Sequence, residues 1–311
     1  MIRLWLTAAC LLIVTSTQLH ADDAFTFLAT GDLPYSAEQE THFRKLLEQS
    51  ESEDFDFLMH VGDFKAGNAP CTDASFLKVR DIFQKYPKPV VYTPGDNEWT
   101  DCNRANSDPL ERLTKIRELF YQDRSTLRLA KLKTVHQGDK KERGERKFAK
   151  YVENFRFMKS GVMFIVVHIV GSKNNYDGGP LARREYENRN EANIAFLKQS
   201  FAEATKDNAA GVAVIIHANP VFENNTPPYS DFLNTMRDFL EKYSKPVVCI
   251  HGDTHTYRID QPLRDRRGKA YSHFTRMEVF GSPAVAGVVV RVKPNSKRVF
   301  AFEPYYLKTK K

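Results

Sequence analysis

VVYTPGD, residues 90–96, decides the fold, because it is one of four apolar segments that end in Gly-Asp. The other three are FTFLATGD, FDFLMHVGD and KPVVCIHGD, which end at Asp32, Asp63 and Asp253. A fifth segment, GVAVIIHANP, carries His217 near its end. Short apolar runs bounded by turn residues are typical of buried strands. The recurrence therefore predicts a sheet that has polar side chains at several strand ends.

Helical patterns alternate with these strands, which indicates an α/β fold. SAEQETHFRKLLEQS begins at Ser36 with the pattern of a capping box, and DPLERLTKIRELF begins at Asp108 with proline next. The ranges 190–204 and 231–243 are two further predicted helices. Three strand patterns near the end of the chain, HFTRMEVF, AGVVVRVK and RVFAFEPYYL, predict a closing β-meander.

Composition and the N-terminus bear on domain organisation and location. The chain has 311 residues, of which 41% are hydrophobic, so it can bury a sizeable core. Residues 1–21 resemble a signal peptide, with one arginine, an apolar stretch and a final alanine, and a membrane anchor is the alternative. We therefore predict an exported protein, periplasmic or secreted, with one domain over 22–311 and no anchor after cleavage. A basic insertion or long loop is expected near 124–156.

Three cysteines remain after residue 21. Cys249 lies in an apolar run, where a buried thiol is expected, whereas Cys71 and Cys102 lie in polar loop sequence. In an oxidising compartment, Cys71 and Cys102 are therefore the predicted disulfide, with two free thiols as the alternative. Much of the net charge of +7 lies in the basic segment, which we interpret as a solvated surface. A surface for an anionic partner is the alternative, and no nucleic-acid module is recognisable there.

The strand-end residues predict a metal site. In an open α/β sheet, ligands bind where loops converge at the carboxyl ends of the strands. Four carboxylates gathered there would repel one another without a cation. We therefore expect metal ions at this edge of the sheet, among Asp32, Asp63, Asp96, Asp253, His217 and the closing HGDTH segment.

The order of these motifs resembles that of the calcineurin-like metallophosphoesterases, whose pattern is GD-x-H, GD, GNH-(E/D), a strand-end histidine and GH-x-H. The resemblance covers residues 25–302 and implies a four-layer β-sandwich flanked by helices, with a two-metal phosphoesterase site. By position, Asp63 would bridge the two ions. Asp32 and His255 would complete one site, and the other would be completed by Asp96, His217 and Asp253.

Several positions depart from the family pattern. Pro34, Asp96 and Asp253 stand where the family has histidine, asparagine and histidine, and Asn97 stands where it has the catalytic histidine. The additional carboxylates favour Mn, Fe, Mg or Ca over Zn. An amide does not donate a proton at ordinary pH, although it can donate a hydrogen bond to an oxyanion.

Two hypotheses follow for the catalytic step. Either Glu98 or His168 is the proton donor, or the leaving group departs unaided, as pyrophosphate would. His168 lies in an apolar strand, where a core histidine is the alternative. Lys65, Arg104 and Lys173 are predicted to bind substrate, and surface charge is their alternative role.

We therefore predict an exported hydrolase of phosphomonoesters, phosphodiesters or pyrophosphate. Its substrate would be a small or envelope-derived compound that contains phosphate. Two alternatives are a non-hydrolytic protein that kept the fold and binds metal or a phosphate ligand, and a protein whose metal ions are only structural.

Overall fold

The structure, a computed structural model, describes residues 24–139 and 146–308, so the predicted signal peptide lies outside it. The strands are β1 (Phe25–Thr30), β2 (Leu58–His60), β3 (Val90–Tyr92), β4 (Val135–His136), β5 (Phe155–Lys159), β6 (Val162–Val166), β7 (Gly211–Ile215), β8 (Val247–His251), β9 (Arg258–Asp260), β10 (Phe274–Glu278), β11 (Ala286–Val292) and β12 (Phe300–Tyr306). The α-helices are α1 (Ala37–Glu51), α2 (Asp73–Lys85), α3 (Pro109–Tyr121), α4 (Gly171–Asn174), α5 (Pro180–Lys206) and α6 (Ser230–Leu240). The 3₁₀ helices are η1 (Thr100–Ala105), η2 (Leu129–Leu132) and η4 (Arg146–Phe148).

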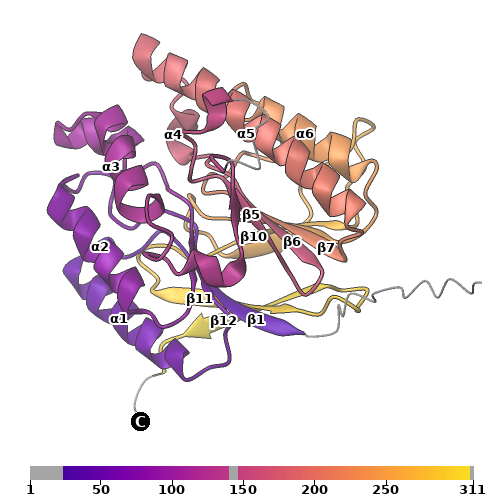
Figure 1. Cartoon of the computed structure of the whole chain (residues 1–311), viewed down its shortest axis with the longest axis horizontal. Helices are drawn as coiled ribbons and strands as arrows, with labels where there is room; N and C mark the ends of the chain where they lie inside the picture. Colours follow the sequence, from indigo (N-terminus) through magenta and orange to yellow (C-terminus); the bar gives the residue numbers. More distant parts are fainter. Residues whose placement is uncertain (1–23, 140–145, 309–311) are drawn as a thin grey trace, which may run out of the picture.

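The strands form two sheets that pack face to face. The five-stranded sheet has the order β12-β11-β1-β2-β3, and the seven-stranded sheet has the order β4-β5-β6-β7-β8-β10-β9. β1, β2 and β3 are parallel, as are β6, β7 and β8. Figure 1 shows α1, α2 and α3 outside the first sheet, and α5 and α6 outside the second.

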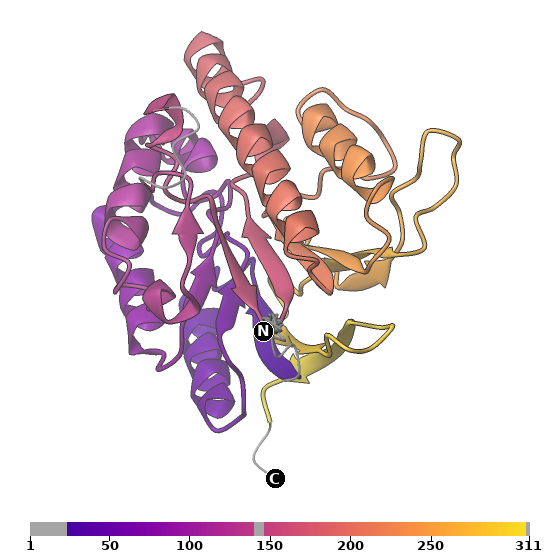
Figure 2. The same ribbon diagram turned by 45° about the vertical axis from the view of Figure 1, so that its right-hand side comes forward.

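Alternating side chains along β6 connect these layers. Val162, Phe164 and Val166 belong to the apolar cluster between the sheets, whereas Met163 and Ile165 belong to the cluster under α5 and α6. This is the period of two that a strand imposes when both of its faces are buried. Figure 2 shows α5, drawn in salmon, and α6, drawn in orange, lying along the outer face of their sheet.

Phenylalanine side chains join the two sheets. Phe27 stacks on Phe57 with ring centroids 4.5 Å apart, and Phe157 stacks on Phe164 at 4.8 Å. Phe164 also meets both Phe27 and Phe57 edge-on, at 5.7 and 5.6 Å. Aromatic pairs in these geometries stabilise a core beyond the area that they bury. The sandwich with flanking helices confirms the predicted fold class.

The predicted helix starts are confirmed at two caps. The Ser36 hydroxyl accepts the Gln39 N–H at the start of α1, and the Asp108 carboxylate accepts the Leu110 N–H at the start of α3. α5 begins at Pro180, ten residues before the predicted range, and α2 had no prediction. Long polar stretches such as the first turns of α5 leave little apolar periodicity from which to place a helix start.

The predicted closing meander is wrong. β10 joins the seven-stranded sheet, parallel to β8, whereas β11 and β12 join the five-stranded sheet beside β1. The three strands are consecutive in sequence, but the pairing partner of a strand depends on tertiary contacts that its own pattern does not record. The predicted basic loop contains η2, β4 and η4 among its described residues, and β5 begins at Phe155. In the described ranges, no helix is long and apolar enough to cross a membrane.

Candidate metal centre

Five strand ends meet at one edge of the sandwich. The five-stranded sheet supplies Asp32 after β1, Asp63 after β2 and Asp96 after β3. The seven-stranded sheet supplies His217 after β7, and Asp253 and His255 after β8. Because these strands are parallel neighbours within each sheet, their carboxyl ends open on the same side. The centre therefore lies across the boundary between the two sheets.

Distances among these side chains define two groups of possible ligands. His217 Nε2 lies 2.8 Å from Asp96 Oδ1 and 3.5 Å from Asp63 Oδ1. His255 Nε2 lies 3.6 Å from Asp32 Oδ1. Among the described residues, two triads offer ligand atoms that all lie within 4.8 Å of one another: Asp32, Asp63 and His217, and Asp96, His217 and Asp253. His217 is thus common to both triads, and Asp63 belongs to the first.

The two histidines present the same nitrogen to the centre. His217 Nδ1 lies 2.8 Å from the Val61 carbonyl oxygen, and His255 Nδ1 lies 2.8 Å from that of Ser282. A carbonyl only accepts, so each Nδ1 carries a hydrogen, and Nε2 is the ring nitrogen that faces the carboxylates. Nε2 is therefore the atom that either ring offers to a metal ion.

The electrostatics of the centre call for a cation. Burial raises the pKa of the Asp32 and Asp63 carboxyls well above their usual range, and neighbouring carboxylates raise both further. Burial, followed by Asp96, also raises the pKa of Asp253, to about 6. Asp32 Oδ2 is buried and has no hydrogen-bond partner among the described residues. Buried oxygens in this number fit hard divalent or trivalent ions.

Two glycines of the Gly-Asp motifs make room for carboxylates that belong to other strands. A Cβ on Gly95 would lie 2.0 Å from Asp63 Oδ1, and a Cβ on Gly252 would lie 2.1 Å from Asp32 Oδ2. Close approach, not a sharp turn, is therefore the reason for glycine at these two positions. The aspartates Asp32, Asp63 and Asp253 have a left-handed backbone, with φ of 53°, 58° and 80°, and so does the motif glycine Gly62, with φ of 98°.

Tyr35 is a residue of the centre that the sequence interpretation missed. Its hydroxyl oxygen lies 3.0 Å from Asp63 Oδ2 and 3.2 Å from His255 Nε2, and it accepts a hydrogen bond from Asn97 Nδ2 at 2.9 Å. The Asn97 backbone N–H donates to Asp63 Oδ1 at 2.9 Å. The sequence signal was the tyrosine that directly follows Pro34, the position at which the motif comparison stopped. Asn97 thus contacts both Asp63 and Tyr35.

Glu98 lies beneath the centre and is fully buried. Its Oε1 accepts hydrogen bonds from the Phe64 N–H at 3.2 Å and from the Tyr92 hydroxyl at 3.3 Å. A general acid must come within hydrogen-bond reach of the leaving group. The placement of Glu98 favours a structural role, in which it fixes the segment after Asp63, over the predicted proton donation.

His168 is likewise fully buried, and its Nδ1 lies 2.9 Å from Glu153 Oε1. Glu153 also pairs with Arg117 at 2.5 Å, and the His168 ring packs 5.5 Å from Trp99. Burial lowers the pKa of His168 to about 4, although Glu153 opposes that shift. His168 therefore lies in the core, which was the alternative placement considered for it from the sequence.

His168 is expected to make unfolding depend on pH. The unfolded chain binds a proton at this residue near pH 6.5, whereas the folded chain binds it only near pH 4, so acidification favours unfolding between these values. From pH 6.5 to pH 5 the loss is about 2 kcal/mol for one such histidine. Urea unfolding of chelator-treated protein should show a smaller loss in His168→Gln than in the wild type. His42→Gln, on α1, is the control, and an unchanged slope in His168→Gln would contradict the expectation.

The three predicted substrate-binding cations lie in different settings. Lys65 is buried, and its Nζ donates to the Asn97 and Ala66 carbonyls at 2.7 and 2.9 Å. Lys173 is 70% exposed and pairs with Asp177. Arg104 is 57% exposed and pairs with Asp101 at 2.7 Å. Lys65 therefore holds the loop of Asn97 in place, whereas Lys173 and Arg104 are exposed side chains that each pair with a carboxylate.

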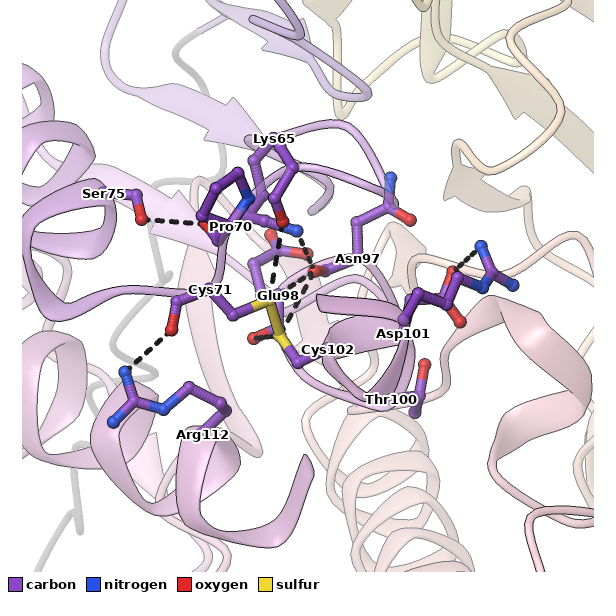
Figure 3. Close-up of a disulfide and its surroundings, with 12 residues drawn as sticks. Lys65, Pro70, Cys71, Ser75, Asn97, Glu98, Thr100, Asp101, Cys102 and Arg112 are labelled. Atoms are coloured by element: carbon purple, nitrogen blue, oxygen red, sulfur yellow. Dashed lines mark hydrogen bonds and ion pairs between the residues drawn. A yellow bond between two sulfur atoms is a disulfide. The ribbon is translucent and has the colours of Figure 1, made fainter. Parts of the chain in front are cut away.

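The predicted disulfide between Cys71 and Cys102 is confirmed, with a Cα–Cα distance of 5.7 Å, and Cys249 is a buried free cysteine. Figure 3 shows the bond beside Lys65 and Asn97, where it ties the loop after β2 to η1 after β3. Arg112 donates to the Cys71 carbonyl at 3.1 Å from α3. The loops that carry Asp63 and Asp96 are thus covalently joined.

Loss of this bond is expected to destabilise the protein. The cysteines are 31 residues apart, so Cys71→Ala/Cys102→Ala should lower the free energy of unfolding by about 3 to 4 kcal/mol. Urea unfolding measures the change. Dithiothreitol should produce a comparable loss in the wild type and none in the double variant. Equal stability of the wild type and the double variant would refute the expectation.

Comparison with known proteins agrees with this fold and site. The family model of the calcineurin-like phosphoesterases matches residues 25–257, and the chain belongs to that family. No curated protein sequence matches the chain.

Solved structures with the same fold have low sequence identity to this chain. A dimetal phosphatase from Danio rerio is 10% identical with a TM-score of 0.55, and the match covers 90% of this chain and 99% of that one. GAP50, described as the anchor in the inner membrane complex of Plasmodium, is 13% identical with a TM-score of 0.52, over 93% and 90% of the two chains. A purple acid phosphatase from yellow lupin seeds is 11% identical with a TM-score of 0.51, over 91% and 54%. At these identities the likeness shows the fold.

Proposed function

We propose that this chain is an exported phosphoesterase that uses two metal ions to hydrolyse a phosphomonoester, a phosphodiester or pyrophosphate. The observation that carries the proposal is the convergence of four buried or half-buried aspartates and two histidines whose Nε2 atoms face them. Family membership supports metal-dependent phosphoester hydrolysis. The proposed ligands are the six strand-end residues predicted from the sequence.

The residues around the ligands suit a phosphoryl group. When bound, paired ions in such a site activate water and stabilise the in-line displacement. The Asn97 amide, 7% exposed, can donate a hydrogen bond to a phosphoryl oxygen. Arg104 lies beside it, since a Cβ on Gly67 would lie 2.7 Å from Asn97 Oδ1 and 3.0 Å from Arg104 Nη1. We assign Arg104 to hold the substrate phosphate from the rim.

The burial of Glu98 and His168 bears on the leaving group. With neither acid at the centre, the hypothesis of an unaided leaving group, such as pyrophosphate, is favoured over proton donation. Four carboxylate ligands against two imidazoles favour Mn, Fe, Mg or Ca over Zn. The disulfide supports an oxidising compartment, periplasmic or extracellular, with a small or envelope-derived substrate.

Metal content and turnover test the proposal together. The mature chain would be stripped with a chelator, reloaded with Mn²⁺ or Zn²⁺, and assayed on an aryl phosphomonoester, an aryl phosphodiester and pyrophosphate. We expect two equivalents of Mn²⁺, activity that returns with Mn²⁺, and faster turnover for the better leaving group. Two bound equivalents without turnover on any substrate would reject the enzyme.

That outcome would favour the second candidate, a non-hydrolytic protein that binds metal or a phosphate ligand. The observation in its favour is Asn97, an amide at the position of the family's catalytic histidine. GAP50, which has the same fold, is described as an anchor.

A further inference from the structure

A left-handed turn follows β6 and reaches the metal centre. Ser172, Lys173, Asn174 and Asn175 have consecutive φ values of 45°, 54°, 54° and 63°, so α4 is a left-handed turn for most of its length. Non-glycine residues adopt this backbone as isolated residues, at a cost of roughly 1 kcal/mol or more each. A run of four therefore requires contacts that hold it.

Arg189 on α5 provides those contacts from the core. Its side chain is fully buried, and its guanidinium donates to Asn174 Oδ1 at 2.7 Å and to the Asn174 carbonyl at 3.0 Å. It also donates to the His168 carbonyl at 2.9 Å and to Glu185 at 2.7 Å. A planar fork with fixed donors suits a task that needs several acceptors held at set angles. Arg189 thus holds both the side-chain amide oxygen and the backbone carbonyl of Asn174.

The other side of the turn meets the metal ligands. A Cβ on Gly171 would lie 2.5 Å from both Asp96 Oδ1 and Asp253 Oδ1. The Ser172 hydroxyl lies 2.7 Å from Asp96 Oδ2 and 2.7 Å from Asp101 Oδ1. The turn is therefore packed against the ligand atoms of the triad formed by Asp96, His217 and Asp253.

The contacts of Asp96 and Asp101 indicate which carboxylate accepts the hydrogen bond from Ser172. A hydroxyl has one hydrogen, so Ser172 donates to one carboxylate at a time. Asp101 has a second partner, because its Oδ2 pairs with Arg104 at 2.7 Å. Donation from Ser172 to Asp96 Oδ2 leaves Oδ1 of Asp96 facing His217 and the centre.

We propose that Ser172 is a positioning residue for the metal ion of the triad Asp96, His217 and Asp253, and that Arg189 sets its place through Asn174. This inference rests on the proposed function, since it takes that triad to bind an ion. Groups that orient metal ligands in this way typically change metal affinity by about 10- to 100-fold.

Mn²⁺ titration of the chelator-stripped mature chain by calorimetry tests the role of Ser172. Ser172→Ala should weaken one of two Mn²⁺ equivalents by about 10- to 100-fold and leave the other unchanged. The metal-free variant should stay folded at the temperature of the titration, because alanine accepts the left-handed backbone about as well as serine does and only the hydrogen bonds of one hydroxyl are lost. Ser272→Ala, an exposed serine before β10, is the control. Unchanged affinity, or equal weakening of both equivalents, in Ser172→Ala would overturn the proposal.

A second variant tests the link through the core. Arg189→Lys keeps the charge and removes the fork, so it should weaken the same equivalent as Ser172→Ala does, whereas Arg184→Lys on the same helix should not. When Arg189→Lys is combined with Ser172→Ala, the further loss of Mn²⁺ affinity should be smaller than the loss that Arg189→Lys causes alone, because both substitutions act on Asp96. Full additivity would refute the link. A wild type that binds no Mn²⁺ would reject the proposed function and the inference together, whereas two normal equivalents in Ser172→Ala would reject the inference alone.

Discussion

Asp63→Asn should abolish turnover while it stabilises the metal-free protein. Asparagine has the shape of aspartate, but it removes the charge from a carboxylate that lies 3.5 Å from His217 and accepts the Asn97 N–H. We expect kcat/KM to fall by more than about 100-fold, beyond what substitutions outside the ligand shell cost. Steady-state kinetics with Mn²⁺ measure the loss of turnover, and metal analysis of the purified variant measures any loss of bound metal.

Stability should change in the opposite direction. Burial and the neighbouring carboxylates raise the pKa of Asp63, so its ionised form is unfavourable in the folded, metal-free chain and that penalty is present at neutral pH. Removal of the charge relieves it, and the thermal midpoint in excess chelator should rise. Asp81→Asn, on the exposed side of α2, controls for the loss of an aspartate. Turnover within tenfold of the wild type in Asp63→Asn would remove Asp63 from the catalytic centre.

Gly252→Ala should have a comparable effect although it replaces none of the proposed ligands. The added methyl would lie 2.1 Å from Asp32 Oδ2, and the backbone at Gly252 does not need glycine for its φ. The Asp32 carboxylate must therefore move, and we expect loss of one metal equivalent together with a fall in kcat/KM of about 100-fold.

Gly211→Ala is the matched control, since Gly211 begins β7 at the end of the sheet opposite to the centre. Its added methyl would meet the Pro246 carbonyl at 3.1 Å and no ligand. This variant should keep both metal equivalents, whatever its stability. If Gly252→Ala retained both equivalents at wild-type affinity, the close packing of glycine against the carboxylate would not matter to the site.

The strand-end residues could be predicted because topology converts a local pattern into a spatial one. Asp32, Asp63 and Asp96 are far apart in sequence, but each ends a parallel strand, and parallel neighbours open on one edge. The physical reason for the glycines was not predictable in the same way. It depends on how closely one strand end approaches the next, as Gly95 approaches Asp63.

The burial of Glu98 could not be predicted, because adjacency in sequence does not give the direction of a side chain. Glu98 follows Asn97, yet its carboxylate turns into the core toward Phe64 and Tyr92. Tyr35 was missed for a different reason. The comparison of motifs ended at Pro34, and the side chain of the next residue lies within hydrogen-bond distance of Asp63 and His255. The sheet that β10 joins could not be predicted either, because strand pairing depends on long-range contacts that a local sequence pattern does not contain.

The division of the ligands between the two sheets has a consequence for how such a protein can diverge. All six proposed ligands come from two stretches, 32–96 and 217–255, that are separated by more than a hundred residues. Mutations, insertions and deletions between these stretches can remodel the surroundings of the substrate while the ligand set is inherited intact. Selection for a new substrate can therefore act on the middle of the chain outside Ser172 and Arg189, whereas selection for a different metal acts on the two stretches and on these two positioning residues.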